Sequence, residues 1–349
     1  MGTAGSSSKS PASLPDTGRL LPWMAAHVHG FRGPLHVEAL SGGQSNPTFR
    51  LTSPSGNYVL RRKPLGPILP SAHAVEREYR ILNALQGSQV PVPRVHALCE
   101  DADILGSPFY VMDFVAGRIF LTVSMPGVTA QERRALFDSM NATIAALHAI
   151  RPEEVGLRDF GRPENYLQRQ VARWTKQYRA SITEPIPQME PIIDWLTRHM
   201  PAERGGCLVH GDFKLDNLIF HGTQPRILAV LDWELSTVGD PLADFAYHLM
   251  PWHLEPDLFR GWAGLDLQAL GIPSENDYAS QYLARTGSMQ VPNWRFYLVF
   301  SMFRLAAILQ GILKRAADGT AADRAAMEVG RQARPVAASA WELASADGA

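Results

Sequence analysis

Residues 208–234, LVHGDFKLDNLIFHGTQPRILAVLDWE, constrain what this chain can fold into more than any other segment. Two short apolar runs, 218–220 and 227–231, flank a polar turn and predict a β-hairpin. Asn217 directly precedes the first run and Asp232 directly follows the second. A hairpin brings both residues to its open end, where an amide oxygen and a carboxylate can bind one hard cation.

A third polar residue, Asp212, lies in the loop before this hairpin, where its carboxylate can accept a proton from a hydroxyl group. One carboxylate base, with an Asn and an Asp holding magnesium, is the minimal set for phosphoryl transfer to an alcohol. A metal hydrolase that uses His210, Asp212, Asp232 and His248 as ligands is an alternative interpretation. It leaves the glycine-rich segment 41–46 unexplained.

The secondary-structure pattern changes near residue 115. Before it, strands and turns dominate, and after it helical periodicity takes over, beginning with a capping box at Thr129 and Glu132. We therefore predict an α+β fold with a flexible tail (1–18), a small β-rich part (19–114) and a larger helical part (115–349). The predicted strands are 37–40, 48–52, 58–61 and 109–115, and the later predicted helices are 164–180, 189–200, 277–285, 293–315 and 323–343.

Two features of residues 19–114 could serve a binding site, one by approaching a phosphate and one by forming an ion pair. The segment SGGQSN (41–46) lies between two strands, and a glycine-rich hairpin tip can approach a phosphate closely, although such a pair of glycines is often only a turn. A helix is predicted from Ser71, as N-cap, to Gln86, and Glu78 lies along its apolar stripe. A buried carboxylate needs a cationic partner, and Arg61 is the nearest candidate in sequence; the alternative is that Glu78 faces solvent.

Composition excludes several classes of function. The chain has 33 Lys+Arg and 34 Asp+Glu, a net charge of −1, which argues against binding nucleic acid or an anionic membrane surface. Two cysteines cannot form a disulfide framework or a cysteine-rich zinc site. Residues 1–18 lack the apolar core of a signal peptide, and Arg304 interrupts the apolar run 296–313, so we expect a buried core helix and a cytoplasmic protein. The sequence predicts no oligomeric state.

The motifs together resemble a known family. HGDFKLDN resembles the protein-kinase catalytic loop H-R-D-x-x-x-x-N, and LDWE stands where kinases carry their metal-binding aspartate. The Gly after the His and the later GDPLADFAYHL resemble the aminoglycoside phosphotransferase and choline-kinase-like group. Upstream, SGGQSNPTFRL resembles the phosphate loop, YVLR the β3 strand, VEREYRIL the helix with the ion-pair Glu, and YVMDFVAGR the hinge. Over residues 35–315 the chain is most similar to the kinase-like domain fused to acyl-CoA dehydrogenases and to its free-standing bacterial relatives.

This resemblance implies a protein-kinase-like two-lobe fold, with a small antiparallel β-rich N-lobe with one main helix, a larger mostly α-helical C-lobe, and ATP bound between them. Arg61 stands at the usual Lys position of β3, and Lys63 on the same face is an alternative phosphate ligand. The implied roles are Asp212 as base, Lys214 for the moving phosphoryl group, Asn217 and Asp232 for Mg²⁺, Gly42, Gly43, Ser45 and Asn46 over the ATP phosphates, Glu78 as partner of Arg61, and Met112, Asp113 and Val115 for adenine.

The implied function is that of a small-molecule kinase that uses ATP and Mg²⁺ and phosphorylates an alcohol. From residue 241 onward the chain has 11 acidic and 9 basic residues, no excess suited to a polycationic aminoglycoside. Arg285, Arg295 and Arg304 could instead meet a carboxylate or a coenzyme A phosphate, so a hydroxy acid or hydroxyacyl-CoA is the expected acceptor. A catalytically idle pseudokinase partner of another enzyme is the alternative. No flavin is expected, because flavin-dependent dehydrogenation needs a large domain of its own.

Overall fold

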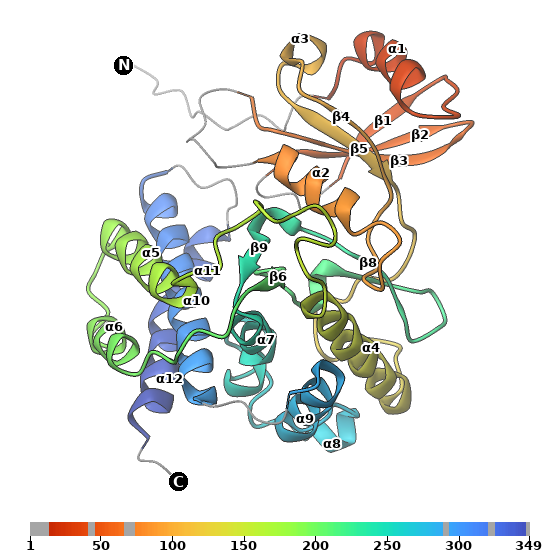
Figure 1. Cartoon of the computed structure of the whole chain (residues 1–349). Coiled ribbons are helices and arrows are strands. Elements are labelled where there is room, and N and C mark those ends of the chain that lie inside the picture. Colours follow the sequence, from red (N-terminus) through yellow and green to blue (C-terminus); the bar gives the residue numbers. More distant parts are fainter. Residues whose placement is uncertain (1–13, 41–45, 66–73, 289–292, 320–324, 347–349) are drawn as a thin grey trace, which may run out of the picture. The chain divides into compact units, whose positions relative to one another are not determined.

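A computed structural model describes residues 14–40, 46–65, 74–288, 293–319 and 325–346. The chain divides into two compact units (Figure 1): unit 1 comprises Met1–Gln86 and Val92–Val115, and unit 2 comprises Gly87–Pro91 and Ala116–Ala349. Unit 1 contains an antiparallel sheet and unit 2 is mostly helical. The predicted fold class is therefore confirmed.

Unit 1 is built on a five-stranded antiparallel sheet in the order β1-β2-β3-β5-β4. Four of these strands, β1, β2, β3 and β5, match predicted strands. The fourth strand in the chain, β4, was not predicted. The strands are β1 (His36–Ala39), β2 (Thr48–Ser53), β3 (Gly56–Arg62), β4 (Val95–Cys99) and β5 (Phe109–Asp113).

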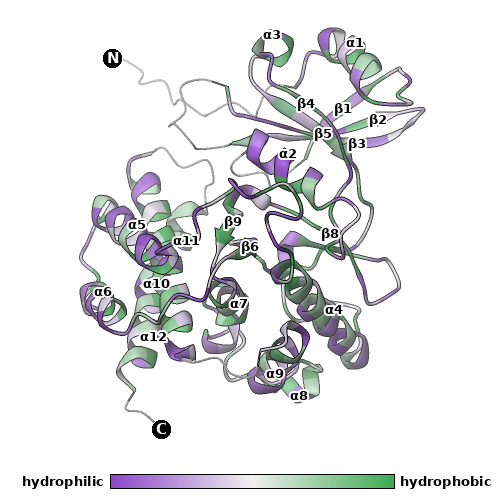
Figure 2. Cartoon of the chain, viewed as in Figure 1, coloured by the Kyte–Doolittle hydropathy of each residue, from purple (hydrophilic) through white to green (hydrophobic). Residues whose placement is uncertain are grey.

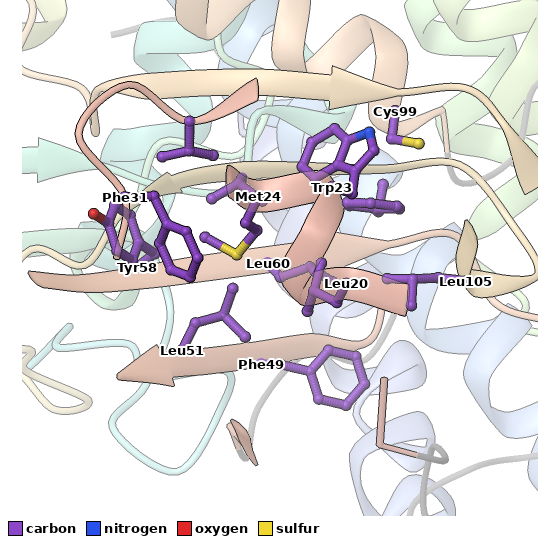
Figure 3. Close-up of a cluster of buried hydrophobic side chains, with 13 residues drawn as sticks. Leu20, Trp23, Met24, Phe31, Phe49, Leu51, Tyr58, Leu60, Cys99 and Leu105 are labelled. Atoms are coloured by element: carbon purple, nitrogen blue, oxygen red, sulfur yellow. The ribbon is translucent and has the colours of Figure 1, made fainter. Parts of the chain in front are cut away.

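One face of the sheet is covered by α1 (Thr17–His27), whose Leu20, Trp23 and Met24 are buried. They pack with strand residues such as Leu51 and Leu60 in one hydrophobic cluster (Figure 3). The side chain of Asp16 caps α1 by accepting a hydrogen bond from the Gly18 N–H at 2.8 Å. Helix α1 therefore begins at Thr17, within the last residues of the tail predicted over 1–18, and it is an addition to the one main helix expected in this part. The short α3 (Ala102–Leu105) lies beside α1.

The opposite face of the sheet receives α2 (Val75–Ala84), which packs against β4 and β5. Tyr79 on α2 meets Tyr110 on β5 edge to face, with ring centroids 6.1 Å apart. Ser71, the predicted N-cap, lies outside the described residues. In the structure α2 begins at Val75 after Ala74, which makes no side-chain cap.

Unit 2 is organised around α10 (Trp294–Ala317), which packs against α5, α7, α11 and α12. α10 is long and apolar enough to cross a membrane by length and composition, but 83% of its most apolar window is buried inside the structure. The prediction of a buried core helix is confirmed, and α7 is likewise mostly hydrophobic (Figure 2). The other helices are α4 (Ala130–His148), α5 (Tyr166–Ser181), α6 (Met189–Arg198), α7 (Pro241–Leu249), α8 (Leu267–Leu270), α9 (Glu275–Thr286), α11 (Ala326–Arg331) and α12 (Ala333–Ser345).

Details at the helix ends separate correct predictions from incorrect ones. The side chain of Thr129 accepts a hydrogen bond from the Glu132 N–H at 3.2 Å, as the capping box predicts for the start of α4. The single helix predicted over 323–343 is in fact two helices, α11 and α12, separated at Gln332.

Two small two-stranded antiparallel sheets of unit 2, of which one is a hairpin, lie within the segment 207–239. Strand β6 (Cys207–Val209) pairs with β9 (Thr237–Gly239), and β7 (Leu218–Phe220) pairs with β8 (Ile227–Val230). The predicted β7–β8 hairpin is confirmed, whereas the three-residue β9 was not predicted. The short 3₁₀ helix η1 (Leu215–Asn217) lies between β6 and β7, and the short 3₁₀ helix η2 (Trp233–Leu235) lies between β8 and β9.

Both cysteines are free thiols. Cys99 is buried in the cluster beneath α1, and Cys207 lies on β6. Burial raises the pKa of each thiol above its ordinary value. At neutral pH both are therefore protonated and weakly nucleophilic.

Candidate active site

The loop that follows β6 makes a tight turn at Gly211, whose φ is +81°. A Cβ at this position would lie 2.7 Å from the carbonyl oxygen of Leu235, closer than real Cβ contacts allow. Only glycine meets both demands, so the Gly of HGD is required by the backbone path of the loop. This explains why no larger residue stands between His210 and Asp212.

Asp244 on α7 holds the loop from below. Its carboxylate accepts hydrogen bonds from the backbone N–H of His210 at 2.8 Å and of Gly211 at 2.7 Å. Nε2 of His148 lies 3.2 Å from the same carboxylate. Burial alone would raise the pKa of Asp244, but the hydrogen bond and charge of His148 outweigh it and lower the pKa. Asp244 is thus an ionised brace, one turn inside the helix that Asp240 caps.

His210 and His248, two of the hydrolase ligand candidates, are both hydrogen-bonded within the protein. In His210, Nδ1 accepts the Asp212 N–H at 3.1 Å and Nε2 donates to the Leu231 carbonyl at 2.9 Å. In His248, Nε2 lies 2.9 Å from the Tyr278 hydroxyl and the ring bonds to the backbone of Phe213. Burial lowers the pKa of His248 to about 4, so the ring is neutral at pH 7.

These bonds count against the alternative metal hydrolase, because both ring nitrogens of His210 are already hydrogen-bonded and Nε2 of His248 is engaged by Tyr278. The described residues also contain no cluster of three or more His, Cys, Asp and Glu side chains that could hold an ion. The hydrolase ligand set is therefore not assembled.

Asp212, Lys214 and Asn217 come together directly. Nδ2 of Asn217 donates to both the Asp212 carbonyl, at 2.9 Å, and its Oδ2, at 3.0 Å. Nζ of Lys214 lies 2.8 Å from the same Oδ2. Asp212 is only 9% exposed, and two donors from its own loop fix the position of its carboxylate.

The charge of Lys214 is stabilised by this arrangement. Burial by itself lowers the pKa of Lys214, but the neighbouring carboxylates of Asp212 and Asp216 outweigh it and raise the pKa overall. Lys214 is therefore a permanent cation next to the candidate base, positioned to neutralise anionic oxygens.

Asn217 and Asp232 fit a magnesium site. The Leu231 N–H donates to the Asn217 carbonyl at 2.8 Å, which places Asp232 beside Asn217 at the open end of the hairpin. Since the amide nitrogen of Asn217 donates to Asp212, its oxygen is the atom left to face a cation. An amide oxygen and a carboxylate match the few protein ligands that Mg²⁺ takes when phosphates supply the others. Asp232 also holds a left-handed backbone, φ +64°, a strained conformation common at functional sites.

Arg304 and Tyr247 contact the catalytic loop, and the sequence predicted neither of these contacts. Arg304 on α10 is 7% exposed, and its Nη2 donates to the Gly211 carbonyl at 2.5 Å. Its guanidinium stacks over the rings of Tyr247 and Trp174, at 4.8 and 5.3 Å from their centroids. Burial raises the pKa of Tyr247, and so do the charge and the hydrogen bond of Asp212, which places the Tyr247 hydroxyl against the candidate base. Arg304 thus supports the loop and does not face an acceptor.

In unit 1 the expected ion pair is present. Nη1 of Arg61 lies 2.9 Å from Oε1 of Glu78, whose side chain is 1% exposed. Lys63, the alternative on the same strand face, pairs with Glu76 at 2.5 Å. The intervening Arg62 is buried and donates to the Leu105 carbonyl at 3.3 Å. Arg61 is therefore the residue of β3 held by the helix carboxylate.

Of the predicted phosphate-loop residues, Gly42, Gly43 and Ser45 lie outside the described residues. Asn46 is described and is 1% exposed, yet its amide nitrogen and oxygen have no hydrogen-bond partner within the part of the chain that the structure describes. An unsatisfied buried amide is costly, and a bound polar group would relieve it.

The predicted hinge residues lie at the end of β5. Met112 is buried, and the Asp113 N–H donates to the Arg94 carbonyl at 2.8 Å. Oδ1 of Asp113 lies 2.6 Å from Nε2 of His96. The side chain of Asp113 is thus engaged with the neighbouring strand, and Val115, just beyond β5, is half-buried.

Comparison with known proteins places this geometry in a family. Residues 36–283 match the sequence profile of the phosphotransferase enzyme family. A crystal structure from Ralstonia eutropha, assigned as an aminoglycoside phosphotransferase, is 52% identical and superposes with a TM-score of 0.87, covering 95% of this chain and 98% of that one. The fold is shared with aminoglycoside phosphotransferase APH(4)-Ia, solved with AMP-PNP and hygromycin B, at 16% identity and a TM-score of 0.62, covering 95% and 99% of the two chains.

Curated relatives are longer proteins. Acyl-CoA dehydrogenase family member 10 of Mus musculus is 45% identical over 90% of this chain and 30% of its own length. Acyl-CoA dehydrogenase family member 11 of Rattus norvegicus is 41% identical over 94% of this chain and 43% of its own length. The chain thus spans less than half the length of these relatives. The profile match over most of the chain, together with the assembled catalytic loop, shows that the protein belongs to the phosphotransferase enzyme family.

Proposed function

We propose that the protein is a small-molecule kinase that transfers the γ-phosphate of ATP to the hydroxyl group of a metabolite in the presence of Mg²⁺. The observation that carries this proposal is the fixed carboxylate of Asp212, held by Asn217 and Lys214 in a loop braced by Asp244. The solved complexes of family members with AMP-PNP support a nucleotide as the donor.

The chemistry follows from the order of these groups. The acceptor hydroxyl gives its proton to a carboxylate oxygen of Asp212 while its oxygen bonds to the γ-phosphorus, and ADP leaves with the electrons of the broken P–O bond. Lys214 offsets negative charge on the phosphoryl oxygens near the base. Asn217 and Asp232 would hold Mg²⁺, which shields the ATP phosphates when bound. Arg61, oriented by Glu78, and the amide of Asn46 would bind phosphate oxygens, while Met112, Asp113 and Val115 would accommodate the adenine.

For the acceptor we propose a hydroxy acid or a hydroxyacyl-CoA. The names of the curated relatives connect this kind of chain with acyl-CoA chemistry. The balance of acidic and basic residues beyond position 241 gives no acidic wall for a polycation. We further propose a cytoplasmic location, where ATP and such thioesters are available.

A pseudokinase is the competing function. It would bind nucleotide without turnover and serve as a partner of another enzyme. The presence of Asp212, Asn217 and Asp232 in mutual register favours an active kinase, because an idle module would have no need to keep all three at this spacing.

The test is ADP formation by wild type and Asp212→Asn with ATP or GTP, Mg²⁺ and a panel of hydroxy acids, hydroxyacyl-CoAs, choline and aminoglycosides. Asp212→Asn keeps the size of the side chain but removes the base, and we expect a loss of about 10²–10⁴-fold in kcat. Asp318→Asn, which removes an exposed carboxylate paired with Lys314, is the matched control. Nucleotide-induced thermal stabilisation without ADP formation from any acceptor would favour the pseudokinase, and a fully active Asp212→Asn would contradict the role of Asp212.

A further inference from the structure

The loop between η3 (Met250–His253) and α8 contains an unusual backbone. Two consecutive residues that are not glycine, Phe259 and Arg260, lie in the left-handed region, with φ of +44° and +61°. Each such residue costs on the order of 1–3 kcal/mol, and the conformation persists only where the surroundings impose it.

The surroundings of this loop do impose it. Leu258 and Trp262 are buried on either side, and the Trp262 N–H donates to the Pro251 carbonyl at 2.9 Å. The Phe259 N–H donates to Oε1 of Gln332 at 3.0 Å. At Gly261 a Cβ would lie 2.0 Å from the Leu254 carbonyl oxygen, so the chain passes too close for any other residue. These contacts hold the loop 258–262 rigidly in place.

The conformation of this loop directs the Arg260 side chain to the catalytic loop. Nη1 of Arg260 lies 2.6 Å from Oδ2 of Asp216, the residue between Leu215 and Asn217 in η1. Asp216 is also close enough to Lys214 to raise its pKa. Arg260 therefore stands next to the segment that carries both the lysine and a candidate metal ligand.

The magnitudes indicate that this ion pair is not the reason for the strain. The Arg260 side chain is 49% exposed, and an exposed pair contributes about 0–1 kcal/mol, less than the cost of two left-handed residues. A guanidinium has five N–H donors, and a half-exposed one with Nη1 on Asp216 presents its remaining donors to solvent. Asp216 thus orients the fork and leaves its other edge open.

The three arginines that the sequence analysis suggested for an acceptor anion, Arg285, Arg295 and Arg304, bond to other groups of the protein. Arg285 donates to Asn141 at 2.7 Å and to Asp138 at 2.6 Å, and Arg295 donates to the Ala346 carbonyl at 2.6 Å. Arg304 is buried behind the loop.

We propose that Arg260 binds an oxyanion of the acceptor and thereby selects anionic alcohols. The inference rests on the proposed kinase function and assigns its acceptor-binding cation. The oxyanion is either the carboxylate of a hydroxy acid or a phosphate of a coenzyme A thioester, and both accept the same bidentate hydrogen bonds from an arginine fork.

The test compares three acceptors in ATP turnover: 3-hydroxybutyrate, 3-hydroxybutyryl-CoA and the uncharged 1,3-butanediol. For Arg260→Ala we expect the KM of the recognised anion to rise about 10–100-fold, as hydrogen bonds to a charged group imply, while the KM for ATP and for the diol stay within about 3-fold. Arg260→Lys should recover part of the loss, because it keeps the charge without the fork. A rise for 3-hydroxybutyrate identifies the carboxylate, and a rise confined to the thioester identifies the coenzyme A phosphates. Arg179→Ala, which also removes an exposed arginine paired with a carboxylate, that of Glu190 at 2.6 Å, is the control and should leave every KM unchanged.

Asp216→Asn separates binding from bracing. If Arg260 only braces η1, then Asp216→Asn and Arg260→Ala will lower kcat equally for all three acceptors, and the proposal is overturned. If wild type phosphorylates none of them, the kinase proposal fails for this panel, and thermal shifts with 3-hydroxybutyrate or 3-hydroxybutyryl-CoA then decide. Stabilisation of wild type that Arg260→Ala loses supports the site, and equal or absent shifts in the two proteins overturn it.

Discussion

At the scale of single residues, Gly211 shows how one backbone position controls the catalytic loop. Gly211→Ala adds a methyl group both to a left-handed backbone and to a 2.7 Å contact with the Leu235 carbonyl. Gly205→Ala isolates the first effect, because Gly205 has nearly the same φ, +82°, with nothing within 4 Å of a Cβ. We expect Gly205→Ala to lower the free energy of unfolding by about 1 kcal/mol. For Gly211→Ala we expect at least about 2–3 kcal/mol and the loss of turnover, because a clash with backbone is added. Urea denaturation and ADP formation measure both, and equal losses for the two variants would contradict the steric argument.

Tyr247 gives a second prediction at this scale. Tyr247→Phe removes the hydroxyl that faces Asp212 and keeps the ring that stacks under Arg304. Because Asp212 acts as a carboxylate base, this hydrogen bond is to a charged group and contributes about 1.5–3 kcal/mol, so kcat should fall roughly 10–150-fold. Tyr297→Phe is the control, since its hydroxyl donates to Asp240 at 3.0 Å, at the far end of α7. A similar fall in kcat for Tyr297→Phe would show that any buried tyrosine hydroxyl in contact with α7 or its cap matters, and would refute a specific effect on Asp212.

The site residues differ in how far the sequence could predict them. Asp212, Asn217 and Asp232 are close along the chain or joined by one hairpin, so local spacing is enough to bring them together. Arg260 and Tyr247 reach the catalytic loop only through the packing of distant elements, and no local pattern reports that. The left-handed Phe259 and Arg260 carry no sequence signal either, since neither residue type favours that backbone.

At the scale of elements, α7 links acid stability to the catalytic loop. The pKa of His248 is lowered to about 4 by burial, whereas an unfolded histidine has a pKa of about 6.5. As the pH falls, the unfolded chain therefore binds a proton at this histidine before the folded chain does. The stability that the neutral, buried His248 contributes is complete above pH 6.5 and is lost as the pH falls towards 4. The loss is about 3 kcal/mol for this group.

Unfolding free energies measured between pH 7 and pH 4 test this. His248→Gln should flatten the fall relative to wild type, whatever its stability at pH 7. His199→Gln is the control, because that ring is exposed and stacks on Trp195 at 4.4 Å. If His248→Gln and wild type lost stability in parallel, another group would be responsible.

Elements were predictable where their pattern was long. Helices such as α4 and α10 carry many turns of apolar periodicity, whereas β9 has three residues and β4 follows two prolines, too little for alternation to show. The pattern for α1 is present, with a capping Asp16 and apolar residues at 20, 23 and 24, but Pro22 and Gly18 weaken it. What settles α1 is the apolar face of the sheet that it covers, a tertiary effect.

At the scale of the whole molecule, charge predicts which acceptors the protein should reject. The fold is shared with an aminoglycoside phosphotransferase solved with hygromycin B, but this chain has a net charge of −1 and its proposed acceptor cation is Arg260. We therefore expect no phosphorylation of hygromycin B or other aminoglycosides under conditions in which anionic alcohols are turned over, since like charges repel at the acceptor. Radiolabelled ATP and product chromatography would check this with both classes at equal concentration. Efficient aminoglycoside phosphorylation would contradict both the charge argument and the assignment of Arg260.

The two thiols of the chain have a practical consequence for spectroscopy. Cys99 is buried beneath α1, Cys207 lies on β6, and burial raises the pKa of both. Thiolates, not thiols, attack the maleimide or methanethiosulfonate group of a labelling reagent, so both sites should react slowly at pH 7. A cysteine introduced at an exposed position of either unit should therefore take up a probe selectively in the otherwise native protein. Spin-label distances between two such probes can then follow the response of the units to nucleotide, without first removing the natural cysteines.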